Sequence, residues 1–521
     1  MNVIRALLVV ILAAPVWANV VYVDATANGL ENGLSWTNAF TSLQDALSYA
    51  AVDSDFVEIH VAQGRYTPDQ GKGVSPGNRL ATFSLRNNVS IQGGYAGIDA
   101  NDPNERNPAV YETILSGDLN HNDLSGFIRD DENSYHVVTA TTTNGTAILD
   151  GVTVTAGNAY SAPTISQMIG GGIYINHSSP TLVGCRFVGN RAYLGGGVYN
   201  SGNPVLVACE FSNNKAHHKT QPGMGGGMYN DQETHALLVD CSFVNNLAAS
   251  FGGGLCNGTF SYSTVTDCTF IENKSAYGGG MMNDISSVPT ITGCTLSNNS
   301  AIWNGGAIHS HLSRLMITRC LFLGNTANDG GGIFNHHGYM ETDRCVFNGN
   351  LAYVCGGGIC NEDMEGAVIT QSIFWDNIAD MGPQIGIRVY RDRGFRTTVR
   401  YADVQGGYLD VYNLDGSLSW SNNIDADPLF AEPGHWDFGR WVDGDYHLQS
   451  AAGRWEPMEQ DWVQDTLTSP CIDAGDPELT WEQEIWPHGE RINIGAYGGT
   501  PEASLSLSNA GQAMDPAEPA P

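Results

Sequence analysis

A two-part phrase that recurs eight times between Gly170 and Asn377 restricts what this chain can fold into. The first part is a glycine pair or triplet followed by an apolar residue. The second part is an apolar residue, two others and an asparagine. This asparagine recurs every 24 to 32 residues, at Asn190, Asn214, Asn246, Asn273, Asn299, Asn325, Asn350 and Asn377. A period of this length indicates a solenoid, in which each repeat is one coil stacked on the next.

The segments between the glycines indicate which solenoid this is. A helical repeat needs ten or more residues of helical periodicity without glycine, and the repeats contain no such window. They contain short apolar or alternating runs, such as 236–239 and 315–318, bounded by Gly, Asn, Ser or Asp. Three short strands per coil, stacked in parallel, would satisfy the backbone. We therefore predict an all-β, right-handed parallel β-helix; leucine-rich repeats are the weaker alternative, because no Leu-x-Leu spacing is kept.

Each repeated residue has a physical role in such a coil. Glycine permits close backbone approach at the bends, asparagine tolerates left-handed backbone and can bond to the next coil, and phenylalanine fills the interior. A cysteine precedes the Phe or Leu by two residues in seven coils, at Cys185, Cys209, Cys241, Cys268, Cys294, Cys320 and Cys345. We predict a buried, reduced ladder there. A bridge between Cys355 and Cys360 stays open, and the absence of paired CxxC spacing argues against zinc.

The paired phrases GG[GA] and Phe-x-x-Asn resemble the repeats of polymorphic outer membrane proteins and related bacterial β-helix proteins. The resemblance covers about two-fifths of the chain. It implies a pectin-lyase-like superhelix at the cell surface, and it specifies architecture rather than chemistry.

The remaining segments are predicted as flanks of the repeats. Residues 1–18, with Arg5, an apolar core and a small-residue end, are predicted to be a secretory signal peptide. Residues 19–160 are expected to form an N-terminal cap with one short helix and the first coils, 161–400 the regular repeats, and 401–502 a C-terminal cap. The tail, 503–521, is small, polar and Pro-rich, and is expected to be disordered.

Charge narrows the class of partner. The net charge is -32, with 23 basic against 55 acidic residues, which makes nucleic acid a poor partner. No segment of the mature chain approaches the 18 apolar residues of a membrane span. We expect an exported, monomeric protein located at the cell surface, outside the cell or in the periplasm. Its expected partner is an extracellular polysaccharide or another cell-surface component.

One acidic loop is a candidate metal site. The spacing D-x-N-x-N-D offers oxygen ligands from Asp118, Asn120, Asn122 and Asp123, and an acidic run follows at 130–132. Calcium prefers such hard oxygen ligands. The loop lacks the glycine and late glutamate of an EF-hand, so a solvated turn is the competing interpretation. No cofactor is predicted to be required, and Ca²⁺ is the one candidate.

Polar residues that follow the glycine phrases form a candidate catalytic group, comprising Asp284, His311, His336 and Glu362. Stacked coils would gather these side chains on one face, where carboxylates and histidines can act as acid and base. They also occupy turn positions, where polar residues are expected without any function.

A basic cluster just after the last regular coil is a candidate substrate-binding site, comprising Arg388, Arg391, Arg393 and Arg396. These residues would bind an acidic glycan, or pair with the surplus of carboxylates.

The C-terminal region carries a second resemblance. Its segments DADPLF (425–430), SPCIDAGD (469–476) and INIGAYGG (492–499) resemble the choice-of-anchor Q region that follows many secreted bacterial β-helices. This implies surface association rather than a reaction. Six tryptophans between 436 and 486 are interpreted as filling the open end of the solenoid.

Two functions follow from these patterns. We favour a non-catalytic β-helix that presents an extended surface for adhesion or polysaccharide binding, because the strong signals are architectural. The alternative is a carbohydrate-active enzyme, either a polysaccharide lyase or a glycoside hydrolase.

Overall fold

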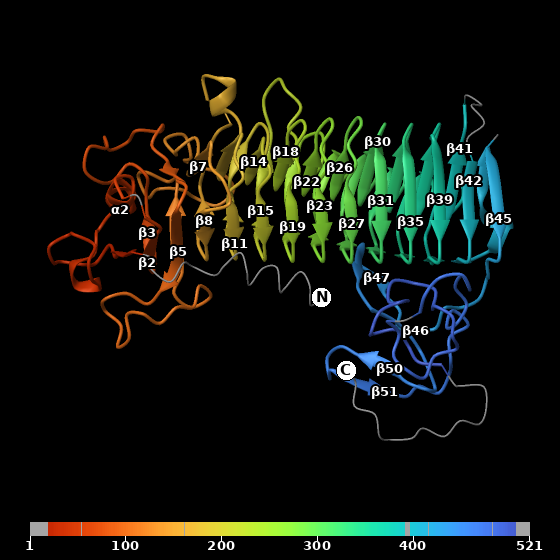
Figure 1. The fold of residues 1–521 in the computed structure, drawn as a ribbon. Coiled ribbons are helices and arrows are strands. Elements are labelled where there is room, and N and C mark those ends of the chain that lie inside the picture. Colours follow the sequence, from red (N-terminus) through yellow and green to blue (C-terminus); the bar gives the residue numbers. More distant parts are fainter. Residues whose placement is uncertain are drawn as a thin grey trace, which may run out of the picture. The chain divides into compact units, whose positions relative to one another are not determined.

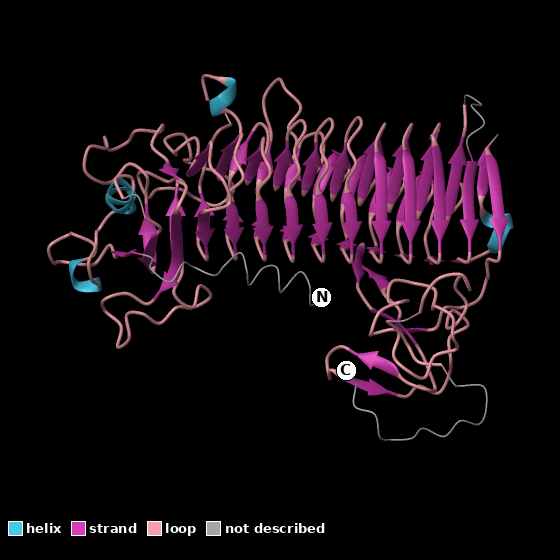
Figure 2. Cartoon of the chain, viewed as in Figure 1, coloured by secondary structure: helices cyan, strands magenta, loops and turns pink. Residues whose placement is uncertain are grey.

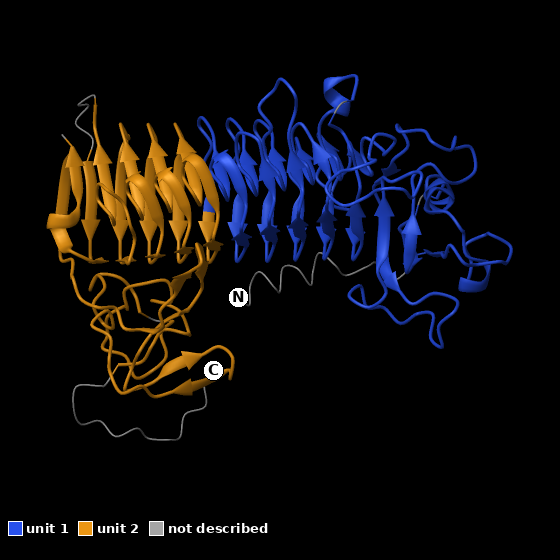
Figure 3. Ribbon diagram, turned by 180° about the vertical axis from the view of Figure 1, so that it is seen from behind, with its two compact units in different colours: residues 1–290 blue, residues 291–521 orange. Residues whose placement is uncertain are grey.

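The computed structural model describes residues 19–53, 55–160, 162–390, 396–414, 416–481 and 483–506. The predicted signal peptide and residues 507–521 of the predicted tail lie outside these ranges. The chain divides into two compact units, residues 1–290 and 291–521 (Figure 3). Strand β27 (Thr290–Thr292) spans the division. Most of the described chain is short strands and turns (Figure 2).

Unit 1 consists of parallel sheets in which each strand pairs with its counterpart one coil away (Figure 1). The first sheet contains β1 (Asn19–Val23), β2 (Val57–Ala62), β5 (Val89–Tyr95), β8 (Ala147–Asp150), β11 (Thr181–Val183), β15 (Val205–Val207), β19 (Leu237–Val239) and β23 (Thr264–Thr266). The second contains β4 (Phe83–Ser84), β7 (Val138–Thr141), β10 (Ile173–Asn176), β14 (Val198–Asn200), β18 (Met228–Asn230), β22 (Leu255–Asn257) and β26 (Met281–Asn283). The third contains β3 (Gly64–Tyr66), β6 (Thr113–Ser116), β9 (Thr153–Thr155), β12 (Arg186–Val188), β16 (Glu210–Ser212), β20 (Ser242–Val244) and β24 (Thr269–Ile271). This is the predicted parallel β-helix.

A fourth parallel sheet, which the sequence does not predict, follows the third. In unit 1 it contains β13 (Arg191–Ala192), β17 (Lys215–Ala216), β21 (Leu247–Ala248) and β25 (Lys274–Tyr277). Its strands begin directly after the repeated asparagine, and most are too short to show any periodicity in the sequence.

The predicted N-terminal helix is confirmed as α2 (Leu43–Ala50). Ser42 caps it by accepting a hydrogen bond from the Gln44 amide at 3.1 Å. Its apolar face, Leu43 with Leu47 and two alanines, is buried against β1 and β4. A 3-10 turn, η1 (Trp36–Asn38), precedes it, and a second, η2 (Ile165–Gln167), lies in a later loop.

Unit 2 also contains four parallel sheets. The first sheet continues with β31 (Arg314–Thr318), β35 (Tyr339–Asp343), β39 (Gly366–Thr370), β42 (Arg396–Arg400) and β45 (Ser417–Ser421), and the second with β30 (Ile308–His311), β34 (Ile333–His336), β38 (Ile359–Glu362), β41 (Ile385–Arg388) and β44 (Tyr412–Leu414). The third contains β28 (Thr295–Ser297), β32 (Leu321–Leu323), β36 (Val346–Asn348), β40 (Ile373–Trp375) and β43 (Asp403–Val404). The fourth contains β29 (Ser300–Asn304), β33 (Thr326–Asp329) and β37 (Leu351–Cys355). The coils therefore continue to Ser421, beyond residue 400, although the repeated phrase has already lapsed.

Phenylalanines stack inside the coils of each unit. In unit 1, Phe211 and Phe243 have ring centroids 4.4 Å apart, and in unit 2 Phe322 and Phe347 lie 4.5 Å apart. All four are fully buried. The first glycine of each phrase has left-handed backbone, as at Gly195 (φ 62°), where any side chain would clash with the Val198 carbonyl.

The predicted cysteine ladder is confirmed. All eleven cysteines are buried and are present as thiols. The ladder thiols donate to backbone carbonyls, as Cys185 Sγ does to Leu149 O at 3.2 Å.

The end of the chain, after η3 (Gly407–Asp410) and β45, forms three antiparallel pairs: β46 (Phe430–Glu432) with β49 (Asp445–Leu448), β47 (His435–Asp437) with β48 (Arg440–Val442), and β50 (Arg454–Glu456) with β51 (Asp461–Val463). Its apolar residues pack with Leu323, Val346 and Ile373 of the third sheet of unit 2. Trp441 backbone groups bond to the Asn298 amide at 2.8 and 3.0 Å. The sequence places the tryptophans at the open end of the solenoid, whereas Trp441 lies on its flank.

Replacement of Phe322 by alanine tests the coil register. The side chain is fully buried in the Phe stack, so its removal is expected to lower the free energy of unfolding by about 3–5 kcal/mol. Urea unfolding followed by circular dichroism measures the change. Unchanged stability would contradict the interior position of this residue.

Candidate functional site

A groove of about 820 Å³ lies in unit 1, along the turns that leave the third sheet. One wall is the loop between β6 and β7, which contributes Asp118, Asp123 and Asn133. The other wall follows successive coils through Asn213 with Lys215, Asn245 with Leu247, and Lys274. The groove therefore combines an irregular acidic loop with a regularly repeated surface.

The loop is folded around the Asp118 carboxylate. Asp118 Oδ1 accepts from the Asn122 amide at 3.0 Å, and Oδ2 accepts from the Asp123 amide at 3.3 Å. Farther along, Asp130 pairs with Arg191 at 3.0 Å, and the Arg191 guanidinium lies 3.7 Å from the Tyr160 ring centroid. The ion pair and the cation–π contact attach the loop to the coils.

Asp118, Asp123 and Glu132 bring carboxylate oxygens within 4.8 Å of one another. Burial raises the pKa of Asp123 to about 6, and the negative charges of Asp118 and Glu132 add to this rise. An Asn133 bond to Asp123 at 2.7 Å opposes it. Three carboxylates this close repel one another, and a divalent cation bound between them would remove the repulsion.

Oxygen atoms without partners also occur in this loop. Asn133 is 1% exposed, and its Nδ2 donates to Asp123 Oδ2 and, at 2.8 Å, to Ala156 O. These bonds fix the amide, yet Asn133 Oδ1 is buried and accepts no hydrogen bond from any residue that the structure describes. Asp123 Oδ1 and Asn122 Oδ1 are likewise buried and accept no hydrogen bond from the described residues. Buried oxygens are normally bonded, so these atoms are available as cation ligands.

The predicted metal residues are thus partly gathered in one place. Asp118 and Asp123 belong to the cluster, and Asn122 lies beside it. Asn120 is exposed and lies outside the cluster. Glu132 completes the cluster; the sequence signal for it was the acidic run 130–132, which the loop folds back toward Asp118.

The opposite side of the groove is basic. Lys215, Leu247 and Lys274 occupy the same position in successive coils of the fourth sheet. The chain has only four lysines, and two of them line this groove. Arg65 also lines it, with Nη1 2.8 Å from Ser116 Oγ and 4.0 Å from Asp118 Oδ2. Sequence reasoning missed these cations because only coil stacking brings them together.

Exposed asparagines lie on the same wall as the lysines. Asn213 and Asn245 have left-handed backbone, with φ of 55° and 53°, in the turns between the third and fourth sheets. Asn245 Nδ2 donates to Asn213 Oδ1 at 2.6 Å. The groove therefore presents the amides of two successive coils beside the lysines, and Gly189 and Glu272 occupy the equivalent turn position in the coils before and after.

The predicted catalytic residues of unit 2 form a ladder in its second sheet. His311 pairs in register with His336, and His336 with Glu362. The His311 and His336 rings are stacked with centroids 5.3 Å apart, and His336 Nε2 lies 3.7 Å from Glu362 Oε1. The fourth predicted residue, Asp284, belongs to unit 1 and follows β26, where its amide donates to Asn257 O at 3.0 Å.

Burial sets the protonation of this ladder. It lowers the pKa of His336 to about 4, and the neighbouring His337 and His311 lower it further. Burial also raises the pKa of Glu362. A neutral imidazole beside a carboxyl group has the composition of an acid–base pair.

Two residues of the predicted arginine cluster, Arg388 and Arg396, are described, and they have different partners. Arg388 is 8% exposed and bridges two carboxylates, with Nη1 3.0 Å from Asp329 and Nη2 2.9 Å from Glu362. It therefore serves an internal ion-pair network. Arg396 is exposed and donates to Ser417 at 3.4 Å. Arg391 and Arg393 lie outside the described residues.

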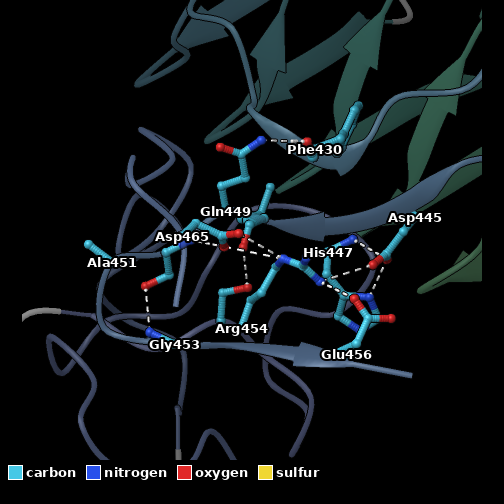
Figure 4. A network of polar contacts seen from close by, with 12 residues as sticks. Phe430, Asp445, His447, Gln449, Ala451, Gly453, Arg454, Glu456 and Asp465 are labelled. Atoms are coloured by element: carbon cyan, nitrogen blue, oxygen red, sulfur yellow. Dashed lines mark hydrogen bonds and ion pairs between the residues drawn. The ribbon is translucent and has the colours of Figure 1, made fainter. Parts of the chain in front are cut away.

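A further buried polar network holds the C-terminal segment together (Figure 4). Arg454 pairs with Asp445, Glu456 and Asp465 at distances of 2.9 to 3.4 Å. His447 Nδ1 lies 2.5 Å from Asp445 Oδ1, and the imidazole stacks on Tyr497. Despite burial, the bonds to Asp445 and Glu502 raise the pKa of His447. Each charge has a partner, which is typical of a structural network.

Comparisons with known proteins agree with this architecture. The family model for the right handed beta helix region matches residues 132–315. The chain is a right-handed parallel β-helix repeat protein. The Chlamydia polymorphic membrane protein repeat matches 319–336 and 344–362, and a model described as disaggregatase related matches 401–475, which overlaps the choice-of-anchor-like segment.

No curated protein matches the chain. Among solved structures, the crystal structure of pectate lyase Pel9A is similar with a TM-score of 0.42 and 14% identity, over 92% of this chain and 96% of that one. No helix in the described part of this β-helix protein has the length and apolar character needed to cross a membrane.

The lowered pKa of His336 predicts a pH dependence. The folded value is about 4, and the unfolded value is about 6.5, so the unfolded chain binds more protons between them. This residue therefore lowers the free energy of unfolding as pH falls from about 6.5 to about 4. In His336→Asn the decline should be smaller, as measured by urea unfolding across that range. Equal declines in both proteins would contradict the assignment.

Proposed function

We propose that this chain is an exported β-helix protein of the cell surface or its surroundings that binds an acidic polysaccharide in the groove of unit 1 without converting it. The observation that carries the proposal is the composition of that groove. Two of the four lysines line the same groove as a partly buried carboxylate cluster, and the amides of Asn213 and Asn245 lie beside these lysines. Similarity to the polymorphic membrane protein repeat supports the surface location, as does the predicted signal peptide.

A repeating ligand suits a repeating surface. Successive coils are spaced by about 4.8 Å, so the equivalent side chains Asn213 and Asn245 of two coils lie side by side in the groove. A polysaccharide offers hydroxyl groups at regular intervals for such amides. A compact small molecule would use only one or two of these positions.

Charge selects the class of polysaccharide. A protein of net charge -32 repels polyanions unless positive charge is concentrated at the binding site. Lys215, Lys274 and Arg65 provide that concentration. Calcium held by Asp118, Asp123 and Glu132 would supply the rest, because it can coordinate a uronate carboxylate together with the protein oxygens. Binding is therefore proposed to require both the lysines and calcium.

Removal of one lysine should weaken binding. Lys215→Ala and Lys274→Ala are each expected to raise the Kd for oligogalacturonate by about three- to tenfold, through the loss of one charge contact. Lys72→Ala removes the same charge from an exposed position outside the groove and serves as the matched control. Calorimetric titration measures the three values. Equal weakening by all three substitutions would indicate a general charge effect and exclude the groove.

Removal of one carboxylate should abolish the effect of calcium. Asp123→Asn keeps the side-chain shape but removes a proposed ligand charge, so calcium should no longer strengthen oligogalacturonate binding. Asp131→Asn makes the same charge change at an exposed position in this loop. Binding is compared with calcium and with chelator. If Asp123→Asn behaves like Asp131→Asn, the calcium assignment is wrong.

A polysaccharide lyase is the second candidate, and one observation favours it. β-Elimination needs a base near the proton next to the uronate carboxylate and a cation that neutralises that carboxylate. The groove has lysines and an arginine facing the carboxylate cluster. The base would remove the proton, a double bond would form, the C–O bond to the next sugar would break, and the departing oxygen would take a proton from the protonated base or from water. A glycoside hydrolase would instead use an acid–base group such as His336 with Glu362.

A panel of acidic and neutral polysaccharides separates these candidates. The binding proposal predicts retention of acidic polymers and no new chain ends. New reducing ends with ultraviolet absorbance of unsaturated sugars would establish a lyase, and new ends alone a hydrolase. For a hydrolase at the ladder of unit 2, His336→Ala should abolish turnover and leave the folded coil intact; unchanged turnover would remove His336 from that site.

A further inference from the structure

Two cysteines of unit 2 lie outside the seven-residue ladder and face each other. Cys355 ends β37 and Cys360 lies in β38, and the glycines 356–358 between them form the bend of the coil. Their sulfur atoms are 3.2 Å apart, and Cys360 Sγ donates toward Cys355 Sγ. The ladder thiols instead donate to carbonyls, as Cys345 does to Asp343 O at 3.4 Å. The ladder sulfurs also interact from coil to coil, as Cys209 does with Cys185 and Cys241, whereas the sulfurs of the pair meet within one coil.

The surroundings hold the two sulfurs together. Both cysteines are fully buried in one cluster with Phe334, and Met381 and Tyr412 pack around it. Gly386 of the next coil lies directly against Cys355. A methyl group at Gly386 would come within 2.3 Å of Cys355 Sγ, so only glycine leaves room for this sulfur. A disulfide needs the sulfurs about 2.05 Å apart, so bond formation requires an approach of little more than 1 Å.

The two thiols are chemically different. The hydrogen bond from Cys360 lowers the pKa of Cys355, and the positive charge of Arg388 lowers it further. Burial raises the pKa of Cys360 well above its usual value. A thiolate is the reactive form of cysteine, so Cys355 is the nucleophile of the pair and Cys360 the thiol that resolves it.

A metal ion is the competing occupant of this place. Asp329 brings a carboxylate oxygen within 4.8 Å of both sulfurs, which gives three ligand atoms. However, Arg388 Nη1 lies 3.0 Å from that carboxylate and also pairs with Glu362. A guanidinium already supplies the positive charge, and a cation added beside it would be repelled. The geometry therefore favours chemistry between the sulfurs over metal binding.

We propose that Cys355 and Cys360 are an oxidisable dithiol that closes to a disulfide while the seven-cysteine ladder stays reduced. With hydrogen peroxide as the oxidant, the Cys355 thiolate attacks one oxygen, the O–O bond breaks, and hydroxide leaves. Cys355 becomes a sulfenic acid. The hydroxide takes the Cys360 proton and forms water. Cys360 sulfur then attacks Cys355 sulfur and displaces a second hydroxide, which takes up the proton released when the thiolate formed. One peroxide is reduced to two waters, and two thiols become one disulfide.

Closure ties the end of β37 to β38 across the glycine bend. Glu362, which pairs with Arg388, ends β38, and Asp329, the other partner of Arg388, ends β33, the strand that pairs with β37. Oxidation also removes the partial negative charge that faces Arg388. The dithiol therefore couples the oxidation state to the same ladder that holds His336 and Glu362.

The test uses the full chain, treated with hydrogen peroxide under native conditions and then alkylated. Peptide mass spectrometry is expected to show loss of two hydrogens and protection from alkylation at Cys355 and Cys360 only. In Cys360→Ala, a dimedone adduct should form at Cys355. In Cys355→Ala, Cys360 should stay unmodified. Cys209 and Cys320 of the ladder, whose pKa values are raised by burial, are internal controls in every sample.

Three results would overturn the proposal. The first is recovery of both thiols in a protein shown to be folded by circular dichroism. The second is oxidation of the ladder cysteines at the same rate as the pair. The third is stoichiometric zinc in the purified protein that is lost in Cys355→Ser. The wild-type measurement alone gives the first two results, so the proposal is testable even if a variant fails to fold.

Discussion

The asparagine ladder is the interaction on which the coils depend. In unit 1 the Asn214 amide donates to Asn246 Oδ1 at 3.0 Å and to the Phe187 carbonyl at 2.7 Å, and its own backbone amide also donates to Asn246 Oδ1 at 3.0 Å. Asn325 and Asn350 repeat the pattern in unit 2. These groups are buried at a bend where strand pairing ends, so without the side chain they would lack partners. The ladder thus lets each coil turn a corner inside the protein and begin the fourth sheet.

This explains which parts of the fold the sequence could predict. The ladder requires asparagine at one fixed position of each regular coil, and phenylalanine and glycine occupy fixed positions near it. The regular coils therefore show a period in the sequence. The strands β42 to β45 show where prediction from the repeated phrase ends. Parallel pairing there uses backbone groups alone, so Arg396–Arg400 stacks on β39 without the phrase. The C-terminal segment shows another limit, because its position against Leu323 and Val346 depends on outward side chains that have no period.

The candidate sites were predictable to the extent that they are local or periodic. Asp118 and Asp123 were found because they share a loop, and His336 with Glu362 because they share a coil position. Lys215 and Lys274 were missed as binding residues because they line a groove only together with the acidic loop of the other wall. Arg388 was noticed for its charge, but burial against Asp329 gives that charge an internal partner. The groove, where a periodic surface meets an irregular loop, is thus the part that only the folded chain reveals.

Calorimetric titration of calcium into the full chain, with and without saturating oligogalacturonate, tests the central claim most directly. The account predicts one calcium per chain and a higher calcium affinity when the oligosaccharide is bound, because the uronate completes the coordination that Asp118, Asp123 and Glu132 begin. Thermodynamic linkage requires an equal gain in oligosaccharide affinity when calcium is bound. The absence of calcium binding, or an affinity that is the same with and without the oligosaccharide, would contradict the proposed site.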